Sequence, residues 1–200
     1  MFIEKIDRDT LLKPLQTVVG IVERKQPLPI LSNVLIEKNK SNIRFVATDL
    51  EIQIATLQQI ETTEETGSIT VSAKKLQEIL RVLPDASKVS LDIQENKLLI
   101  KANKSKFNLQ TLPAQDFPVV TDQLENASKI SIKQGLLKKL LGLVQYAMAQ
   151  QDIRYYLNGV LLVIDEDKIR LIATDGHRLA YVSSTLEIKY AKHEVILSRK

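Results

Sequence analysis

The sequence has no cysteine and only two histidines in 200 residues. Without cysteine the chain can form neither a disulfide framework nor a thiolate metal site, and a reducing cytosol is the natural compartment. A transition-metal site would have to rest mostly on carboxylates, so neither a metal nor a cofactor is expected. Charges interrupt residues 1–7 where a signal peptide needs an apolar core, and no apolar run reaches the roughly 18 residues of a membrane span. A soluble, cytoplasmic protein is expected.

Glycines and aromatic residues are also few. The six glycines are scattered and no Gly-Lys-Ser/Thr sequence occurs, so a phosphate-cradling loop is excluded, and nucleophile elbows are absent too. An aromatic content of 4% argues against stacking on the bases of a single strand. The net charge of +4 is a weak bias that does not identify a polyanionic partner. Any nucleic-acid partner is therefore expected to be a duplex.

What the sequence does contain is a globular balance of 44% hydrophobic and 26% charged residues. It also contains an internal repeat. Residues 43–49 recur 126 positions later at 169–175, with Ile-Arg and Ala-Thr-Asp identical. Residues 31–36 match 157–162 at the same shift, and residues 11–15 match 136–140 at a shift of 125. We interpret residues 1–125 as one complete domain and residues 128–200 as a second, incomplete copy, joined by a linker at 112–128.

Hydrophobic periodicity predicts the elements of one copy. Strands are expected at residues 2–6, 30–37, 43–48, 51–60, 68–71, 88–93, 97–102 and 105–112. A first helix carries an apolar stripe from Leu11 to Val22, interrupted by Pro14, and a second helix follows Ser72, a plausible N-cap. The expected class is α+β, with two helices on one face of antiparallel sheets in each repeated domain.

Cations follow the polar faces of the predicted helices. Lys13, Thr17, Gly20 and Arg24 share one face of the first helix, and no acid is expected to interrupt it. Lys138 and Lys74 lie on the polar faces of the corresponding second-copy helix and of the helix after Ser72. Such cations are expected on a surface that binds the phosphate backbone of a nucleic acid without recognising its bases. Ordinary solvated helix faces are the alternative.

The Ala-Thr-Asp sequence ends equivalent strands in both copies. Because Asp49 and Asp175 are shared, a structural role is expected for them, such as capping the following turn. The copies differ immediately afterwards, where residues 176–179 of the second copy read Gly-His-Arg-Leu. A feature held by one copy alone is the better candidate for a binding surface. An acid–base role for His177 with Asp175 is the alternative.

Several segments together resemble one family, the bacterial sliding clamps, which are beta subunits of DNA polymerase III. The resemblance runs through residues 11–15, 28–33, 48–51, 107–117 and 151–159, and its most specific part is 173–180, Ala-Thr-Asp-Gly-His-Arg-Leu-Ala. It implies the DNA-clamp fold and a head-to-tail homodimeric ring with three similar domains in each subunit. Duplex DNA would pass through the ring, bound without sequence specificity, and the protein would be a polymerase processivity factor, not an enzyme.

The resemblance also implies three sets of site residues. With the cations on the helices, the DNA-binding set is Lys13, Arg24, Lys25, Lys74, Lys138, Gln151, Tyr155 and Tyr156. A pocket for peptides of the replicative polymerase, the clamp loader and other clamp-binding-motif proteins is implied at Leu157, Thr174, Gly176, His177, Arg178 and Leu179. The subunit interface is implied at Lys75, Lys104, Lys106, Phe107 and Leu109.

A third clamp domain has no counterpart in these 200 residues, so the chain is expected to be a truncated clamp that cannot close a ring. Two other classes stay open on the residues alone. One is a small-molecule enzyme using His177 and Asp175, and the other is a sequence-specific DNA-binding module. Residues 186–200 would carry an unpaired strand edge without the rest of their sheet.

Overall fold

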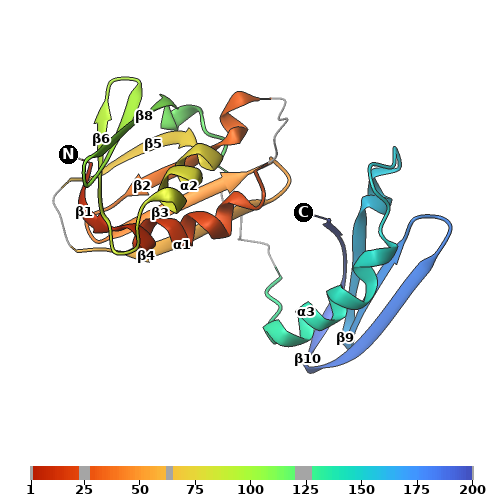
Figure 1. The fold of residues 1–200 in the computed structure, drawn as a ribbon. Coiled ribbons are helices and arrows are strands. Elements are labelled where there is room, and N and C mark those ends of the chain that lie inside the picture. The colour runs from red at the N-terminus through yellow and green to blue at the C-terminus, as the bar shows by residue number, and fades with distance from the viewer. Residues whose placement is uncertain (1, 23–27, 62–64, 120–127, 200) are drawn as a thin grey trace. The chain divides into compact units, whose positions relative to one another are not determined.

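The computed structural model describes residues 2–22, 28–61, 65–119 and 128–199. It divides the chain into two compact units, Met1–Asp122 and Gln123–Lys200, each of which is described by itself (Figure 1). Of the linker predicted at 112–128, residues 120–127 lie outside the described part. None of the described helices is long and apolar enough to cross a membrane.

The first unit is an antiparallel sheet with two helices on one face (Figure 1). Its elements are β1 (Ile3–Asp7), α1 (Arg8–Val19), η1 (Pro29–Ser32), β2 (Asn33–Lys38), β3 (Asn42–Thr48), β4 (Gln53–Gln59), β5 (Gly67–Ser72), α2 (Ala73–Val82), β6 (Lys88–Gln94), β7 (Lys97–Ala102), β8 (Ser105–Leu112) and η2 (Ala114–Asp116). The eight strands are ordered β1-β6-β7-β8-β5-β2-β3-β4. This is the α+β arrangement predicted from the periodicity.

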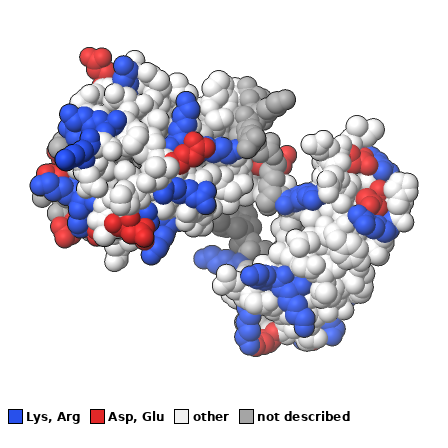
Figure 2. Space-filling view, in the orientation of Figure 1, with Lys and Arg blue, Asp and Glu red and all other residues white. Residues whose placement is uncertain are grey.

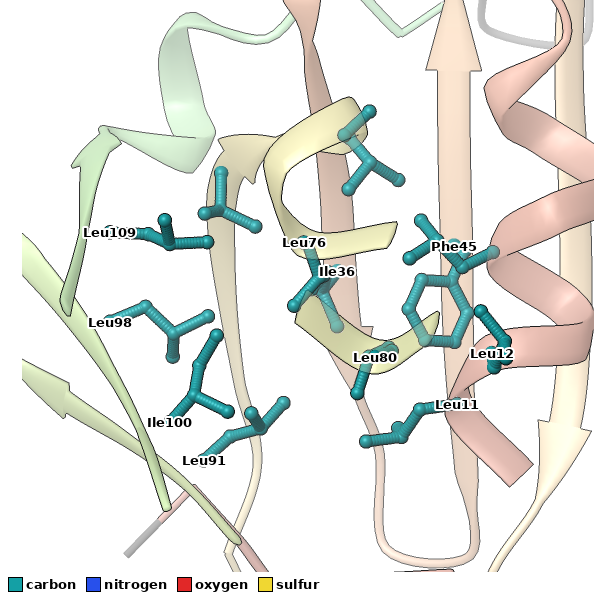
Figure 3. Close-up of a cluster of buried hydrophobic side chains, with 14 of the residues drawn as sticks. Leu11, Leu12, Ile36, Phe45, Leu76, Leu80, Leu91, Leu98, Ile100 and Leu109 are labelled. Atoms are coloured by element: carbon teal, nitrogen blue, oxygen red, sulfur yellow. The ribbon is translucent and has the colours of Figure 1, made fainter. Parts of the chain in front are cut away.

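The core of the first unit lies between the helices and the sheet (Figure 3). Leu11 and Leu12 of α1 and Leu80 of α2 point toward Phe45 on β3. All four side chains are buried, as the stripe at helical spacing predicts. Pro14 lies inside α1 and is itself buried, so the helix continues through it.

Two predicted boundaries are wrong by a few residues for local reasons. The strand expected at 30–37 begins only at Asn33, because Pro29 starts a 3-10 turn over residues 29–32. The strand expected at 51–60 spans Gln53–Gln59, because residues 49–52 form a turn. Ser72 occupies the N-cap position of α2 as predicted, although its side chain makes no capping hydrogen bond.

The polar face of α1 is less uniformly basic than the sequence analysis expected. Asp9 lies one turn before Lys13, and its Oδ2 is 3.8 Å from the Lys13 Nζ. The expectation that no acid interrupts this face is therefore wrong. The spacing i, i+4 places both side chains on the same line of the helix, so the acid could have been found by extending that line by one turn toward the N-terminus.

The second unit is a hairpin-like sheet with one α-helix packed on it (Figure 1). Its elements are α3 (Gln134–Val144), η4 (Gln145–Ala147), η5 (Tyr155–Asn158), β9 (Gly159–Thr174) and β10 (Leu179–Ser198). The two long strands pair antiparallel in two stretches, separated by irregular register between Thr185 and His193. Leu140 and Val144 of α3 are buried against this sheet.

The repeat holds at the level of strand register. The pairs Asn33↔Ser72 and Thr48↔Gln53 of the first unit reappear 126 residues later as Gly159↔Ser198 and Thr174↔Leu179. Residues 193–198 are thus strand-paired even without the remainder of a complete copy. The counterpart of β1, residues 128–132, forms no strand, because β1 pairs with β6 and the 200 residues contain no counterpart of β6.

Candidate docking site and charged surfaces

A tight turn joins β9 to β10 and is held by the side chains of Thr174 and Asp175. The Asp175 Oδ1 accepts hydrogen bonds from the backbone N–H groups of His177 and Arg178, each at 3.0 Å. The Thr174 Oγ1 accepts from the N–H of Gly176 at 3.1 Å and donates to the carbonyl of Arg178 at 2.7 Å. Short polar side chains fold a backbone into a turn in this way.

The first unit contains the same turn between β3 and β4. The Asp49 Oδ1 accepts from the N–H groups of Glu51 and Ile52 at 3.0 and 2.8 Å, and Thr48 repeats the contacts of its counterpart. This confirms the structural role predicted for the shared Thr-Asp sequence. The turn geometry belongs to the repeat, and what distinguishes the second copy is the set of side chains that the turn presents.

Residue 176 and its counterpart Leu50 share a left-handed backbone but differ in residue type. Leu50 has φ of 79° and its counterpart Gly176 has φ of 89°. This left-handed region is open to glycine at no steric cost and is unfavourable for leucine. A Cβ on residue 176 would also lie 3.4 Å from the Arg154 Nη2. Glycine there adopts the left-handed conformation without strain, and the Arg154 guanidinium lies in van der Waals range of this position.

The Asp175 carboxylate is fully engaged by groups other than the His177 imidazole. Its Oδ2 accepts from the Arg178 Nε at 3.0 Å, and its Oδ1 holds the two backbone N–H groups. Those backbone hydrogen bonds, with the Arg178 charge, lower the pKa of Asp175 below its ordinary value. The His177 imidazole has no hydrogen bond or ion pair within the described residues. An Asp175–His177 acid–base pair is not formed.

A second cluster, centred on Asp152, fixes the segment next to this turn. The Asp152 carboxylate accepts from the Nε and Nη2 of Arg154 at 3.1 and 2.9 Å and from its backbone N–H at 2.8 Å. The Asn158 amide bridges both ends of the segment: its Oδ1 accepts from the N–H of Asp152 and its Nδ2 donates to the carbonyl of Asp152. The side-chain and backbone hydrogen bonds from Arg154 lower the pKa of Asp152 to about 2.

We expect the carboxyl carbon of Asp152 to titrate with a midpoint near pH 2 by ¹³C NMR. Because the folded-state pKa is below the unfolded value near 3.9, the pair stabilises the fold above about pH 4. That stabilisation is lost as the pH falls toward 2. In Arg154→Ala the midpoint should move up toward the unfolded value. A midpoint near 4 in the unaltered chain would contradict the paired geometry.

Two arginines define the polar side of the candidate docking site. The Arg154 guanidinium lies beside Gly176, and the Arg178 guanidinium lies over the Tyr146 ring, 5.7 Å from its centroid. Leu179 is 65% exposed at the start of β10, a large apolar side chain with nothing covering it in this unit. The site thus combines exposed apolar surface with oriented cations, which suits a short peptide with apolar anchors and polar flanks.

The residues implied as a partner-peptide pocket lie around this turn. Leu157 belongs to η5 and Thr174 ends β9, and both are half-buried. Gly176, His177, Arg178 and Leu179 are exposed in sequence along the turn. The sequence analysis did not single out Arg154 or Tyr146, which contact the same turn from earlier segments. Their proximity depends on the folding of residues 145–158 and has no local signature.

The described residues of the implied DNA-binding set occupy four elements, α1, α2, α3 and η5, and the loop before η5. Lys13 on α1 and Lys138 on α3 are exposed, whereas Lys74 on α2 is half-buried. Gln151, Tyr155 and Tyr156 are exposed at or just before η5, where the two tyrosine rings meet edge to face at 6.0 Å. Arg24 and Lys25 lie outside the described residues.

Charge is distributed differently over the two units. Figure 2 shows Lys and Arg interspersed with Asp and Glu over the visible face of the first unit. In the second unit, Lys and Arg gather around the start of α3. Within the described part of the chain, no group of three or more His, Asp or Glu side chains could hold a metal ion.

The implied interface residues lie on α2 and around the turn between β7 and β8. Lys75, Lys104 and Lys106 are exposed, and Phe107 is half-buried. Leu109 is only 8% exposed and belongs to the core of its own unit. Its side chain packs into that core, whereas the three exposed lysines are available to contact another chain.

Both units of the chain match known protein families. The family model for the N-terminal domain of the DNA polymerase III beta subunit matches residues 1–121, and the model for the central domain matches residues 131–200. The beta sliding clamp of Pseudomonas putida KT2440 is 44% identical over 196 residues, and that of Escherichia coli K12 is 36% identical over 195. Each alignment covers 98% of this chain and 53% of the relative.

Solved structures agree with the sequence comparison. The crystal structure of the DNA polymerase III subunit beta from Pseudomonas aeruginosa superposes with a TM-score of 0.90 at 44% identity, covering 98% of this chain and 53% of that one. A sliding clamp from Caulobacter crescentus gives 0.89 at 37% identity, covering 100% and 55%. The fold is that of the sliding clamps.

The chain belongs to the DNA polymerase III beta subunit family. It spans about half the length of the relatives that it matches.

Proposed function

We propose that the chain works as part of a DNA polymerase processivity factor, a ring-shaped sliding clamp that encircles duplex DNA in the cytoplasm and has no catalytic activity of its own. The single observation that carries this proposal is the family match along nearly the whole chain, from residue 1 to residue 200. In this proposal residues 1–125 form the first clamp domain and residues 128–200 belong to the second. A third domain lies outside these 200 residues.

The DNA-facing surface is proposed to consist of Lys13, Arg24, Lys25, Lys74, Lys138, Gln151, Tyr155 and Tyr156. A clamp must hold a duplex without stopping at any sequence. Lysines and arginines that displace counterions from phosphates supply attraction without base readout. The Asp9 carboxylate beside Lys13 weakens the local field on α1, which keeps the attraction moderate.

The docking site is proposed to capture a short segment of the replicative polymerase, the clamp loader or another protein with a clamp-binding motif. Leu157, Leu179 and the Thr174 methyl group would receive apolar anchors. Arg178 is already oriented by Asp175 and Tyr146, so it loses little freedom when it pairs with a polar group of the peptide. His177, exposed beside it, would orient a second polar group.

The ring is proposed to close head to tail between two subunits through Lys75, Lys104, Lys106, Phe107 and Leu109. The exposed lysines of this set would meet acids on the third domain of the next subunit. Phe107 supplies apolar surface at the same edge, and Leu109 holds β8 in place from the core. In this proposal the 200 residues carry one of the two surfaces that meet at each contact between subunits.

The decisive experiment follows retention on nicked circular DNA after a salt wash. A chain extended in its own reading frame to include a third repeat should be retained on the circle and released when the circle is linearised. Residues 1–200 alone should wash off, because they cannot close a ring. Retention of residues 1–200, or a sequence-specific footprint of either protein, would contradict the proposal. In the extended protein, His177→Ala should weaken partner-peptide binding and leave retention unchanged.

A further inference from the structure

Lys38 is a buried cation at the end of β2. It is 3% exposed, and strand alternation from Val34 and Ile36 directs its side chain to the helix-covered side of the sheet. The counterpart of Lys38 in the second unit is Ile164, which is 1% exposed, so the position is a core position in both copies. A lysine in place of that isoleucine introduces a charge into a site built for an apolar side chain.

The Lys38 ammonium lacks a protein partner in the described part of the chain. No oxygen of a described carboxylate lies within 4.0 Å of its Nζ, and no hydrogen bond to it is formed. The nearby Lys88 differs, since its Nζ is 2.9 Å from the Asp7 Oδ1. Burying a charge without a partner is strongly unfavourable, whereas a buried charge with a paired counter-ion is tolerated.

Lys38 lines a cavity of about 270 Å³ at this end of the first unit. The other lining residues are Ile3, Glu4, Lys5, Ile6, Asp7, Thr10, Gln59, Ile60, Glu61 and Lys88. Three of them, Ile3, Ile6 and Ile60, give the cavity an apolar wall, while Glu4 and Glu61 are exposed to solvent. The cavity therefore offers one buried cation that no described carboxylate contacts within 4.0 Å, next to branched apolar surface, and the third acid of the lining, Asp7, pairs with Lys88.

We infer that this cavity binds a small organic carboxylate whose head pairs with the Lys38 ammonium and whose short hydrocarbon tail packs on the isoleucines. A charge-assisted hydrogen bond to a carboxylate would satisfy the buried Nζ. The volume is at the small end for ligand sites, which limits the ligand to about four to six carbon atoms. This site lies in the first unit, apart from the docking turn, and does not depend on the proposed clamp function.

Binding can be tested on the 200-residue chain with isovalerate as the probe and its neutral isostere isovaleramide as the control. Isovalerate should cause saturable NMR shifts of the backbone amides of Ile3 and Ile60, and isovaleramide at the same concentrations should not. Inorganic phosphate at matched ionic strength should bind at least about tenfold more weakly, because it lacks a tail for the apolar wall. Equal binding of the amide or of phosphate would overturn the inference.

Variants separate the role of Lys38 from general charge effects. Lys38→Met keeps a long side chain and removes the cation, so isovalerate affinity should fall at least about tenfold. Lys97→Met removes an exposed lysine of β7 and should leave the affinity unchanged. Unchanged binding in Lys38→Met, or an equal loss in Lys97→Met, would refute the assignment.

Thermal unfolding gives a second readout, and its first part uses only the unaltered chain. Isovalerate should raise the unfolding midpoint of the unaltered chain, because a ligand that binds only the folded state stabilises it. Lys38→Met without ligand should also unfold at a higher temperature than the parent, since an unpaired buried charge has been removed. A midpoint in the parent that is insensitive to isovalerate, or a lower one in Lys38→Met, counts against the proposal.

Discussion

Replacing Asp175 by alanine should weaken binding of a partner peptide at least about tenfold, because the turn that presents Gly176 to Leu179 loses one of the two side chains that hold it. The substitution removes the acceptor for two backbone N–H groups and the partner of the Arg178 Nε. The backbone of residues 176–178 keeps the two hydrogen bonds of the Thr174 hydroxyl but loses both of those to Asp175, and Arg178 is free to leave its place over Tyr146. Fluorescence anisotropy of a labelled peptide bearing the clamp-binding motif of the polymerase measures the change.

The first copy of the repeat supplies a matched control. Asp49→Ala removes the same acceptor from the same kind of turn, which loses its hydrogen bonds to Glu51 and Ile52. Peptide binding should be unaffected, because that turn presents none of the docking residues. Asp175→Asn, which keeps the Oδ1 acceptor, should retain most of the affinity. Equal losses in Asp49→Ala and Asp175→Ala would show that the docking site is elsewhere.

Phe45→Ala should lower the free energy of unfolding of the first unit by about 3–5 kcal/mol, through lost burial and the cavity left behind. Phe45 is fully buried on β3 between α1 and α2, so neighbouring side chains cannot easily fill the space (Figure 3). Denaturant unfolding followed by hydrogen exchange measures the loss and assigns it to residues 2–119.

The repeat again offers the control for this substitution. Position 171 in the second unit, the counterpart of Phe45, is a fully buried leucine. Phe45→Leu should therefore cost clearly less than Phe45→Ala, because the position tolerates a leucine in the same structural setting. If both variants lost the same stability, the packing of Phe45 against the two helices would not be the source of the effect.

Much of the fold could be predicted because it depends on short-range regularities. The alternation of apolar and polar residues and their helical spacing involve only neighbouring residues. For this reason β7 and β8 begin and end at the residues that the pattern predicts. The repeat then carries the register of the first unit onto the second. The boundaries that were wrong involve competition between local structures: Pro29 favours a 3-10 turn over an early strand start.

The parts that escaped prediction depend on residues far apart in the sequence. Arg154 contacts the turn at Gly176, and Tyr146 packs under Arg178, through folding that no local pattern encodes. The burial of Lys38 is a further case, because a lysine at the end of an alternating strand is ordinarily expected to reach solvent. Residues 176–179 were singled out because the two copies differ there, whereas Leu157 and Thr174 were implied as pocket residues only by the family resemblance.

The turn shared by the two units has a consequence for how such a site can arise and be altered. Its backbone is held mainly by the Thr and Asp side chains, so the residues that follow are less constrained, apart from the left-handed position at residue 176 or 50. After duplication, one copy could accumulate new chemistry at residues 176–179 while its twin at 50–53 kept a different set. The turn of the first unit has the same backbone and carries none of the docking residues, so it is a second position at which a binding site could be engineered.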